Sequence, residues 1–328
     1  GGRSLTKAYY YGDDGVPTGV LYAGGRVYHE LLYTYSHGTL SEITLSGGGG
    51  TVWKLTEMNG MGMPTKVRTG DIQREYGYTD YGMPLYRKFG AHQHFAYDFD
   101  PHTGNLMSRT DALRGITEEY GYDNLNRLTD ENGRETEYAD NGSMVSRDGV
   151  GTATYNAAPN AYRLKELRAA AGNGFSYSPL SIDYTSFSRP AEISKDKYAA
   201  MIIADMRGRA SLPGGIGVID SLISGGGAVP IDTAIRHPVT NIHPIVAKFT
   251  YNERGERVKM EVTEGDDVLA CRYYIGGVYE VDEVTGEERL YIGGDAYTAP
   301  AVDICNADGE WELHFIGRDY LGSVTHIA

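Results

Sequence analysis

The sequence is poor in cysteine, which limits the classes of protein it can belong to. Only Cys271 and Cys305 occur among 328 residues. Two cysteines are too few for a disulfide-built scaffold, and their spacing fits no metal-binding motif. We interpret them as two buried thiols. A bridge between them stays open as an alternative, because both fall in predicted strands of one region and would meet only in a suitable register.

Long apolar runs and an excess of positive charge are also missing. No stretch approaches the roughly 18 apolar residues that a membrane-spanning helix needs, and no signal peptide opens the chain. We therefore expect no membrane insertion. The formal net charge of −14 argues against nucleic acid and anionic membrane surfaces as partners, because both are polyanions.

Catalytic and metal-binding motifs are equally scarce. The sequence contains no GxSxG elbow, no HExxH motif and no pair of glutamates at a recognisable catalytic spacing. His92 and His94 stand two positions apart, yet no third ligand accompanies them. We therefore expect no enzyme, no cofactor and no metal site.

Tyrosine and glycine are abundant instead, with 27 Tyr against 7 Phe and 44 Gly. This composition suits many short strands joined by tight turns. An aromatic residue, any residue and then Tyr recur along the chain, and residues two apart in a strand share one face. Each pair is expected to pack its rings into the core while the Tyr hydroxyl finds a polar partner. The pairs are Tyr9/Tyr11, Tyr33/Tyr35, Tyr76/Tyr78, Phe95/Tyr97, Tyr120/Tyr122, Phe175/Tyr177 and Phe249/Tyr251.

Most pairs are followed by a polar turn and then by an apolar residue, as in YGYDNLNRL and FTYNERGERV. Strand, tight turn and returning strand are typical of a β-hairpin. The pairs recur at about 20 to 25 residues, so the sequence predicts an array of repeated antiparallel hairpins.

One segment interrupts this array. Residues 198–247 are rich in Ile, Ala, Gly and Pro and have no Tyr after Tyr198. We predict a repeat array over 1–197, an insertion of unknown role over 198–247, and C-terminal hairpins over 248–328. The last region is expected to turn at Thr285-Gly286 and at Asp308-Gly309.

The sequence resembles the RHS/YD-repeat proteins. The resemblance rests on YGYDNLNRLTDENG, FDPHTGNLMSRTD, RYYIGGVYEVD and the closing RDYLGSVTHIA. It covers roughly Tyr33 to Ser194 and Phe249 to Ala328. In the closing segment, the motif that ends the family's core is interpreted as a strand, and it consists of Asp319, Tyr320, Leu321, Gly322 and Ser323.

The resemblance implies an all-β ribbon of hairpins that spirals into part of a hollow shell, similar to the cocoons of bacterial toxin complexes and the barrel of teneurins. Such a shell encloses or presents a C-terminal effector domain, which would lie beyond residue 328. It also implies a bacterial protein that is secreted or displayed on the cell surface. The family's self-cleavage segment follows the DYLGS motif, so no protease role is carried over to this chain.

A second hypothesis is a cell-surface binding or adhesion module that recognises a carbohydrate or protein ligand. It predicts an outward patch of exposed tyrosines, whereas the shell hypothesis predicts an inward face lined by the repeats. In either case, strand edges left open by the array would favour self-association.

Overall fold

The computed structural model describes residues 4–169, 180–195, 203–204, 210–211 and 243–328. These residues form strands, turns and irregular segments, and no helix occurs among them. Accordingly, nothing in the described ranges is a helix of the length and apolar character that a membrane crossing would require. The predicted all-β fold of repeated antiparallel hairpins is confirmed.

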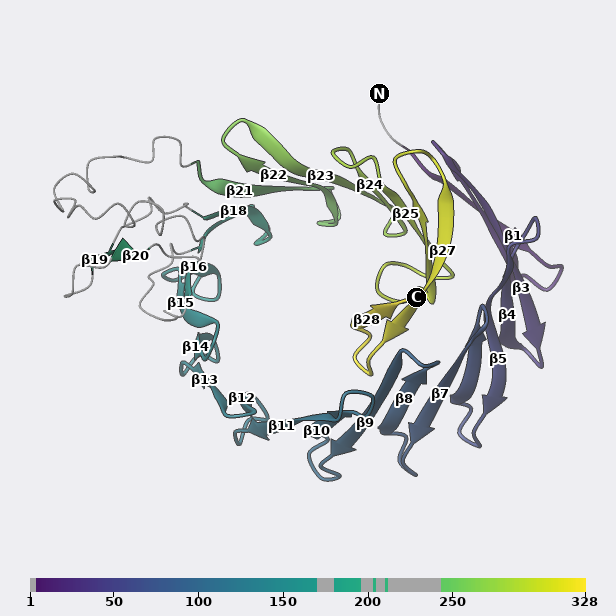
Figure 1. Ribbon diagram of the computed structural model, residues 1–328, viewed down its shortest axis with the longest axis horizontal. Coiled ribbons are helices and arrows are strands. Elements are labelled where there is room, and N and C mark those ends of the chain that lie inside the picture. Colours follow the sequence, from purple (N-terminus) through teal and green to yellow (C-terminus); the bar gives the residue numbers. More distant parts are fainter. Residues whose placement is uncertain (1–3, 170–179, 196–202, 205–209, 212–242) are drawn as a thin grey trace, which may run out of the picture. The chain divides into compact units, whose positions relative to one another are not determined.

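The strands follow one another along the chain as short elements separated by turns (Figure 1). The first twelve are β1 (Thr6–Tyr11), β2 (Pro17–Gly24), β3 (Val27–Ser36), β4 (Thr39–Leu45), β5 (Gly50–Met58), β6 (Pro64–Thr69), β7 (Ile72–Tyr78), β8 (Pro84–Phe89), β9 (Gln93–Phe99), β10 (Leu106–Asp111), β11 (Ile116–Tyr122) and β12 (Leu128–Glu131).

The middle strands are β13 (Arg134–Tyr138), β14 (Met144–Arg147), β15 (Gly151–Tyr155), β16 (Leu164–Ala169), β17 (Leu180–Tyr184), β18 (Pro190–Lys195), β19 (Ile203–Ala204), β20 (Ala210–Ser211) and β21 (Ile245–Tyr251). The last are β22 (Arg257–Glu264), β23 (Asp267–Ile275), β24 (Tyr279–Asp282), β25 (Glu288–Ile292), β26 (Ala301–Cys305), β27 (Trp311–Arg318) and β28 (Val324–Ile327).

The chain divides into two compact units. Unit 1 comprises Gly1–Gly133, Arg257–Lys259 and Ala270–Ala328, and unit 2 comprises Arg134–Glu256 and Met260–Leu269. In unit 1, consecutive strands from β1 through β12 pair with one another, as do consecutive strands from β23 through β28. The hairpins predicted at Thr285-Gly286 and Asp308-Gly309 are confirmed as β24–β25 and β26–β27.

The core of unit 1 joins segments far apart in the sequence. Val20, Tyr22 and Leu31 from β2 and β3 are buried together with Leu290 and Ile292 from β25, each at most 2% exposed. Fully burying such a side chain stabilises the fold by about 1.5–3 kcal/mol. Figure 1 shows the purple N-terminal strands beside the yellow C-terminal hairpins accordingly.

Polar contacts reinforce this junction. Arg26 Nε lies 2.7 Å from Glu288 Oε1, and the buried His29 Nε2 lies 2.6 Å from Asp303 Oδ2. The Tyr279 hydroxyl also donates to Glu288. Each of these side chains has a partner for at least one of its polar atoms, which offsets part of the cost of burying it.

In unit 2, β13 to β18 pair in sequence order and β18 then pairs directly with β21. Strand β21 begins at Ile245, inside the range predicted as an insertion. Within that range, β19 and β20 form a two-stranded pair of their own. The adjacency of β18 and β21 means that the repeat ladder continues across the segment between them.

One turn recurs at many hairpins. In it, the first residue after the strand accepts hydrogen bonds through its side chain from the backbone N–H groups two and four positions later. Asn59 Oδ1, for example, accepts from Met61 N and Met63 N, both at 3.0 Å. The intervening Gly62 has φ 76°, which glycine adopts without strain. We call this first residue the turn cap. It is Asn59, Thr79, Asp123, Asn252 or Asp319 in the five turns that show both bonds.

Candidate functional site at the C-terminal hairpin

The core-end motif forms a turn, which corrects the prediction of a strand. Asp319 to Ser323 connect β27 to β28. Asp319 is the turn cap, and its Oδ1 accepts from Leu321 N at 3.0 Å and Ser323 N at 2.8 Å. Gly322 has φ 90°, which interrupts any extended strand at this point. The motif is therefore a further copy of the repeat turn.

The aromatic ring of this turn anchors the hairpin to β9. The Tyr320 ring centroid lies 4.9 Å from that of Tyr97 and 5.3 Å from that of Phe99, both in edge-to-face geometry. Phe95 and Leu106 complete the cluster. Burial raises the pKa of Tyr97 to about 12. Aromatic pairs of this geometry add about 0.5–1.5 kcal/mol each beyond the area they bury.

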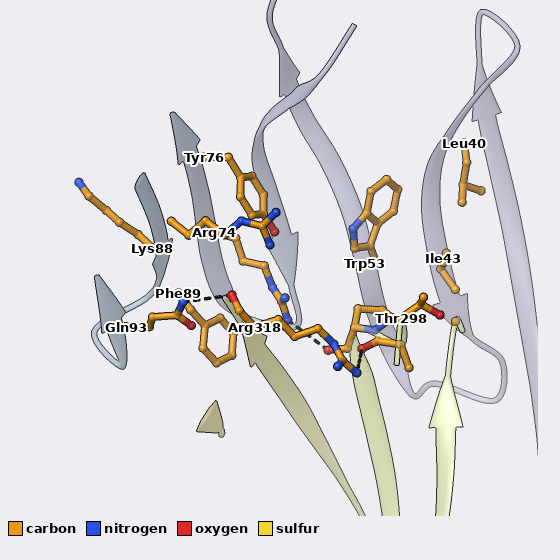
Figure 2. A pocket seen from close by; sticks show the side chains of 14 residues that line it. Leu40, Ile43, Trp53, Arg74, Tyr76, Lys88, Phe89, Gln93, Thr298 and Arg318 are labelled. Atoms are coloured by element: carbon orange, nitrogen blue, oxygen red, sulfur yellow. Dashed lines mark hydrogen bonds between the residues drawn. The ribbon is translucent and has the colours of Figure 1, made fainter. Parts of the chain in front are cut away.

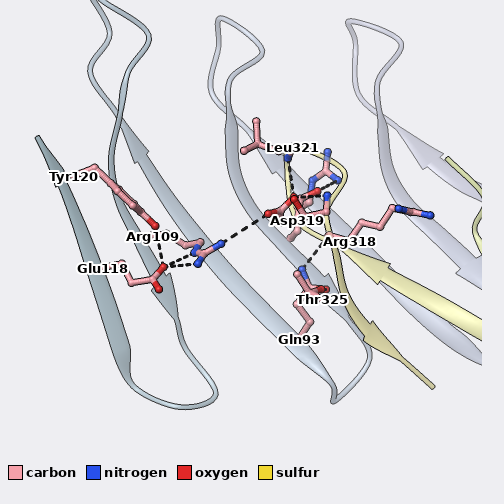
Figure 3. A network of polar contacts seen from close by, with 10 residues as sticks. Gln93, Arg109, Glu118, Tyr120, Arg318, Asp319, Leu321 and Thr325 are labelled. Atoms are coloured by element: carbon pink, nitrogen blue, oxygen red, sulfur yellow. Dashed lines mark hydrogen bonds and ion pairs between the residues drawn. The ribbon is translucent and has the colours of Figure 1, made fainter. Parts of the chain in front are cut away.

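A polar network holds the same turn from the other side (Figure 3). Arg87 Nη1 donates to the Asp319 carbonyl at 2.8 Å, and Arg109 Nη1 lies 3.8 Å from Asp319 Oδ2. Arg109 Nε also donates to Glu118 Oε2 at 2.6 Å, and the Tyr120 hydroxyl donates to the same oxygen at 2.9 Å. The buried Asp319 thus ties β8, β10 and β11 to the end of β27.

Gln93 connects both strands of the C-terminal hairpin to β9. Its side chain is 2% exposed. Gln93 Nε2 donates to the Arg318 carbonyl at 3.1 Å, and Thr325 Oγ1 donates to Gln93 Oε1 at 2.9 Å. A buried amide with both ends bonded fixes position more sharply than apolar packing, because any shift leaves a polar group unsatisfied. We call Gln93, Asp319, Tyr320 and the residues bonded to them the hairpin anchor.

The predicted ring pairs take different environments. Phe95 and Tyr97 are buried, whereas Tyr33, Tyr35, Tyr76, Tyr78, Tyr120, Tyr122, Phe249 and Tyr251 are half-buried. Tyr9 and Tyr11 are exposed. Phe175 and Tyr177 lie outside the described residues.

Several repeat tyrosines donate their hydroxyl across to the preceding hairpin. The acceptor is the carbonyl of the first residue of the strand alongside, as in Tyr122 to Leu106 at 3.0 Å and Tyr184 to Leu164 at 2.8 Å. Tyr155 and Tyr251 make the same bond to Met144 and Pro190. The tyrosine pattern was visible in the sequence, but the acceptors are backbone carbonyls, which any residue supplies.

Other predicted features are placed as follows. His92 lies in the turn before β9 and His94 lies within that strand. Among the described residues, no three His, Cys, Asp or Glu side chains gather to hold a metal ion. Cys271 and Cys305 are both buried, and no disulfide joins them. Burial raises the pKa of the Cys305 thiol.

Comparison with known proteins gives matches in structure alone. No family model matches the chain, and no curated protein matches it. The crystal structure of TcdB2-TccC3-Cdc42 contains a chain of similar fold, with a TM-score of 0.57 and 13% identity over 98% of this chain. The present chain has this toxin-complex fold. A mutant Tc holotoxin pore from Photorhabdus luminescens is also similar, with a TM-score of 0.47, 14% identity and 98% coverage of this chain.

The chain spans 17% of the length of each of these toxin-complex chains. The resemblance to RHS/YD-repeat proteins is confirmed at the level of this fold. The partners of those longer proteins are not assigned to this chain.

Proposed function

We propose that the chain is a non-catalytic section of a protein shell, which encloses or presents a C-terminal effector domain of the same polypeptide. The toxin-complex fold over 98% of the chain supports this proposal. So does the repeat construction, in which each hairpin buries its face only against its neighbours and therefore suits a continuous wall. The proposal includes a bacterial protein that is secreted or displayed on the cell surface.

The hairpin anchor is the observation that carries the proposal. Gln93, Asp319 and Tyr320 fix β27 and β28 against β8 to β11 through buried polar and aromatic contacts. A domain that follows β28 in the natural protein would start from a backbone position set by these contacts. A shell that encloses a C-terminal domain needs a fixed position for the backbone where that domain begins. Otherwise the domain would not start on a defined face of the shell.

The test is to express the natural protein with whatever follows residue 328 and to measure its intact mass and its elution on size exclusion. A separate C-terminal fragment that co-elutes with the shell, or an uncleaved following domain protected from added protease, supports the proposal. A natural protein without a further domain, or with one that is fully open to protease, contradicts it.

One observation favours the alternative of a surface-binding module. Tyr10, Tyr28 and Leu32 lie on the face of β1 to β3 opposite the core and are 38%, 77% and 43% exposed. Exposed tyrosines are common in recognition surfaces. Binding of the chain to cells or glycans, abolished by Tyr28→Ser and unchanged by Tyr81→Ser, would support this alternative.

A further inference from the structure

A cavity of about 310 Å³ lies within unit 1, between the sheet of β4 to β9 and the segment that leads into β26 and β27 (Figure 2). Its two ends differ in chemistry. Leu40, Ile43 and Trp53 form an apolar end, and Figure 2 shows them together on the side of the cavity away from Lys88. The other lining residues are Arg74, Tyr76, Arg87, Lys88, Phe89, Gln93, Gly293, Thr298, Ala299, Pro300 and Arg318.

The lining is strongly cationic. It includes Arg74, Arg87, Lys88 and Arg318 but no aspartate or glutamate. Lys88 Nζ lies 3.4 Å from Glu75 Oε2, outside the lining, and the three arginines make no ion pair with a carboxylate in the described part of the chain. Three guanidinium groups gathered without a counter-ion are unusual in a chain with a net charge of −14.

The arginine N–H groups are largely occupied by backbone carbonyls. Arg74 Nη2 donates to Pro300 O at 3.1 Å, and Arg318 donates to Gly322 O at 2.8 Å and to Ala296 O at 2.9 Å. These bonds hold the cavity walls together, but none of them is to a carboxylate. Arg318 Nε is also buried without a hydrogen-bond partner.

Burial of the positive charge has an energetic consequence. Arg74 is 8% exposed, and burial lowers its pKa, with Arg318 and Arg87 contributing to the same effect. Burial also lowers the pKa of Arg318. An anion in the cavity would relieve both the desolvation and the mutual repulsion of these cations.

We propose that this cavity binds a small organic anion: a carboxylate or phosphate faces Arg74 and Arg87, and a single planar or sugar ring lies against Trp53. The volume sits at the lower end of small-molecule sites, which are about 300–1,000 Å³, so it accommodates one ring rather than a longer chain. Charge-assisted hydrogen bonds to guanidinium are the strong polar contacts of such sites. This inference does not depend on the proposed shell function.

Tryptophan fluorescence provides a direct assay, because the chain contains only Trp53 and Trp311. In the 328-residue chain carrying Trp311→Phe, emission comes from the cavity. The probes are glucuronate, benzoate, phenyl phosphate and inorganic phosphate, with glucose and benzyl alcohol as neutral analogues. We expect a saturable change with at least one ring-bearing anion and at least tenfold weaker binding of its neutral analogue.

Variants distinguish charge from folding. Arg87→Gln is expected to weaken binding at least fivefold, whereas Arg87→Lys retains the charge and most of the affinity. Arg114→Gln is one control, because its side chain is 70% exposed and outside the cavity. Lys88→Gln is a second control, because the Lys88 ammonium pairs with Glu75 on the opposite face of β8 from Arg87. Thermal melting of each variant checks that the fold is intact.

Carboxylate and phosphate probes with the same ring identify which anion the site prefers. The proposal is overturned if no ring-bearing anion gives a saturable change up to about 10 mM, a concentration at which binding is worth less than about 3 kcal/mol. It is equally overturned if neutral analogues bind as tightly, if inorganic phosphate matches the ring-bearing anions, or if folded Arg87→Gln binds like the unmodified chain.

Discussion

Asp319 gives the sharpest test of the hairpin anchor, because two substitutions separate its hydrogen bonding from its charge. Asp319→Ala removes the acceptor of two backbone N–H groups as well as the negative charge near Arg109. Asp319→Asn keeps an Oδ1 acceptor and removes only the charge. Asn59 and Asn252 already serve as turn caps in the same geometry, so Asn fits this turn.

The expected magnitudes follow from exposure. The N–H groups of Leu321 and Ser323 each lose a partly buried hydrogen bond to the Asp319 carboxylate, and water can replace part of what is lost because both residues are exposed. We expect Asp319→Ala to cost about 2 kcal/mol, in line with hydrogen bonds to charged groups and with caps. Asp319→Asn loses a contact with an arginine that is 29% exposed, which is worth at most about 1 kcal/mol.

Native-state hydrogen exchange measures these costs locally, which suits a chain of two units whose unfolding need not be two-state. The amides of Phe315 and Ala328 bond to each other's carbonyls across β27 and β28 and report on the hairpin. Their exchange is expected to accelerate roughly 30-fold in Asp319→Ala and at most about fivefold in Asp319→Asn, at about 1.4 kcal/mol per tenfold. Amides of β2 and β3 serve as the internal control. Equal acceleration by both substitutions, or none by alanine, would refute the cap assignment.

Three further outcomes are expected. Tyr184→Phe should speed hydrogen exchange of the β16 and β17 amides by about fivefold, since it removes a hydrogen bond worth about 1 kcal/mol. Tyr81→Phe, at a residue that is 90% exposed, should have no effect, and equal exchange in the two variants would contradict the role of the Tyr184 hydroxyl. Hydrogen bonds from the backbone and side chain of Arg127 hold the pKa of Asp123 below its ordinary value. The ionised Asp123 carboxylate therefore stabilises the fold above about pH 4, and this stabilisation is lost as the pH falls through the lowered pKa of the folded state. An Asp123 pKa at or above the ordinary value, measured by NMR titration, would refute this. Replacing residues 198–242 by a short glycine-containing turn should preserve the β18–β21 pairing and lower the entropic cost of closing this loop by about 2 kcal/mol. Urea unfolding of unit 2 would measure this gain, and loss of the circular-dichroism strand signal would show instead that the segment is required for folding.

The local part of the fold could be predicted from the sequence. Alternating aromatic residues and turn residues predicted the hairpins, because both the strand period and the turn depend on neighbouring residues. The same local chemistry also contained the signal that was missed at the core-end motif. Asp319 with Gly322 repeats the spacing of Asn252 with Gly255, and this cap and positive-φ pair identifies a turn rather than a strand.

The hairpin anchor and the cavity could not be predicted in this way. Gln93 meets Arg318 and Thr325 across 225 and 232 residues. Most of the acceptors that position the arginines are backbone carbonyls, which leave no trace in residue identity. A sequence pattern can show that Arg74 stands in a strand, but only the packing of β25 to β27 against β7 and β8 shows that its charge is buried.

Arg318 links the repeat pattern to the cavity. It stands directly before the turn cap Asp319, the place that Tyr122 and Tyr251 take before Asp123 and Asn252. The strand register shifts at Tyr122 and at Arg318 alike, and both side chains donate to backbone carbonyls. A neutral phenol would thus satisfy the repeat geometry here, yet the position carries a cation. The residues before the five turn caps are Met58, Tyr78, Tyr122, Tyr251 and Arg318. Only Arg318 is charged, and it lines the cavity, which is the arrangement expected if the positive charge serves a ligand rather than the fold alone.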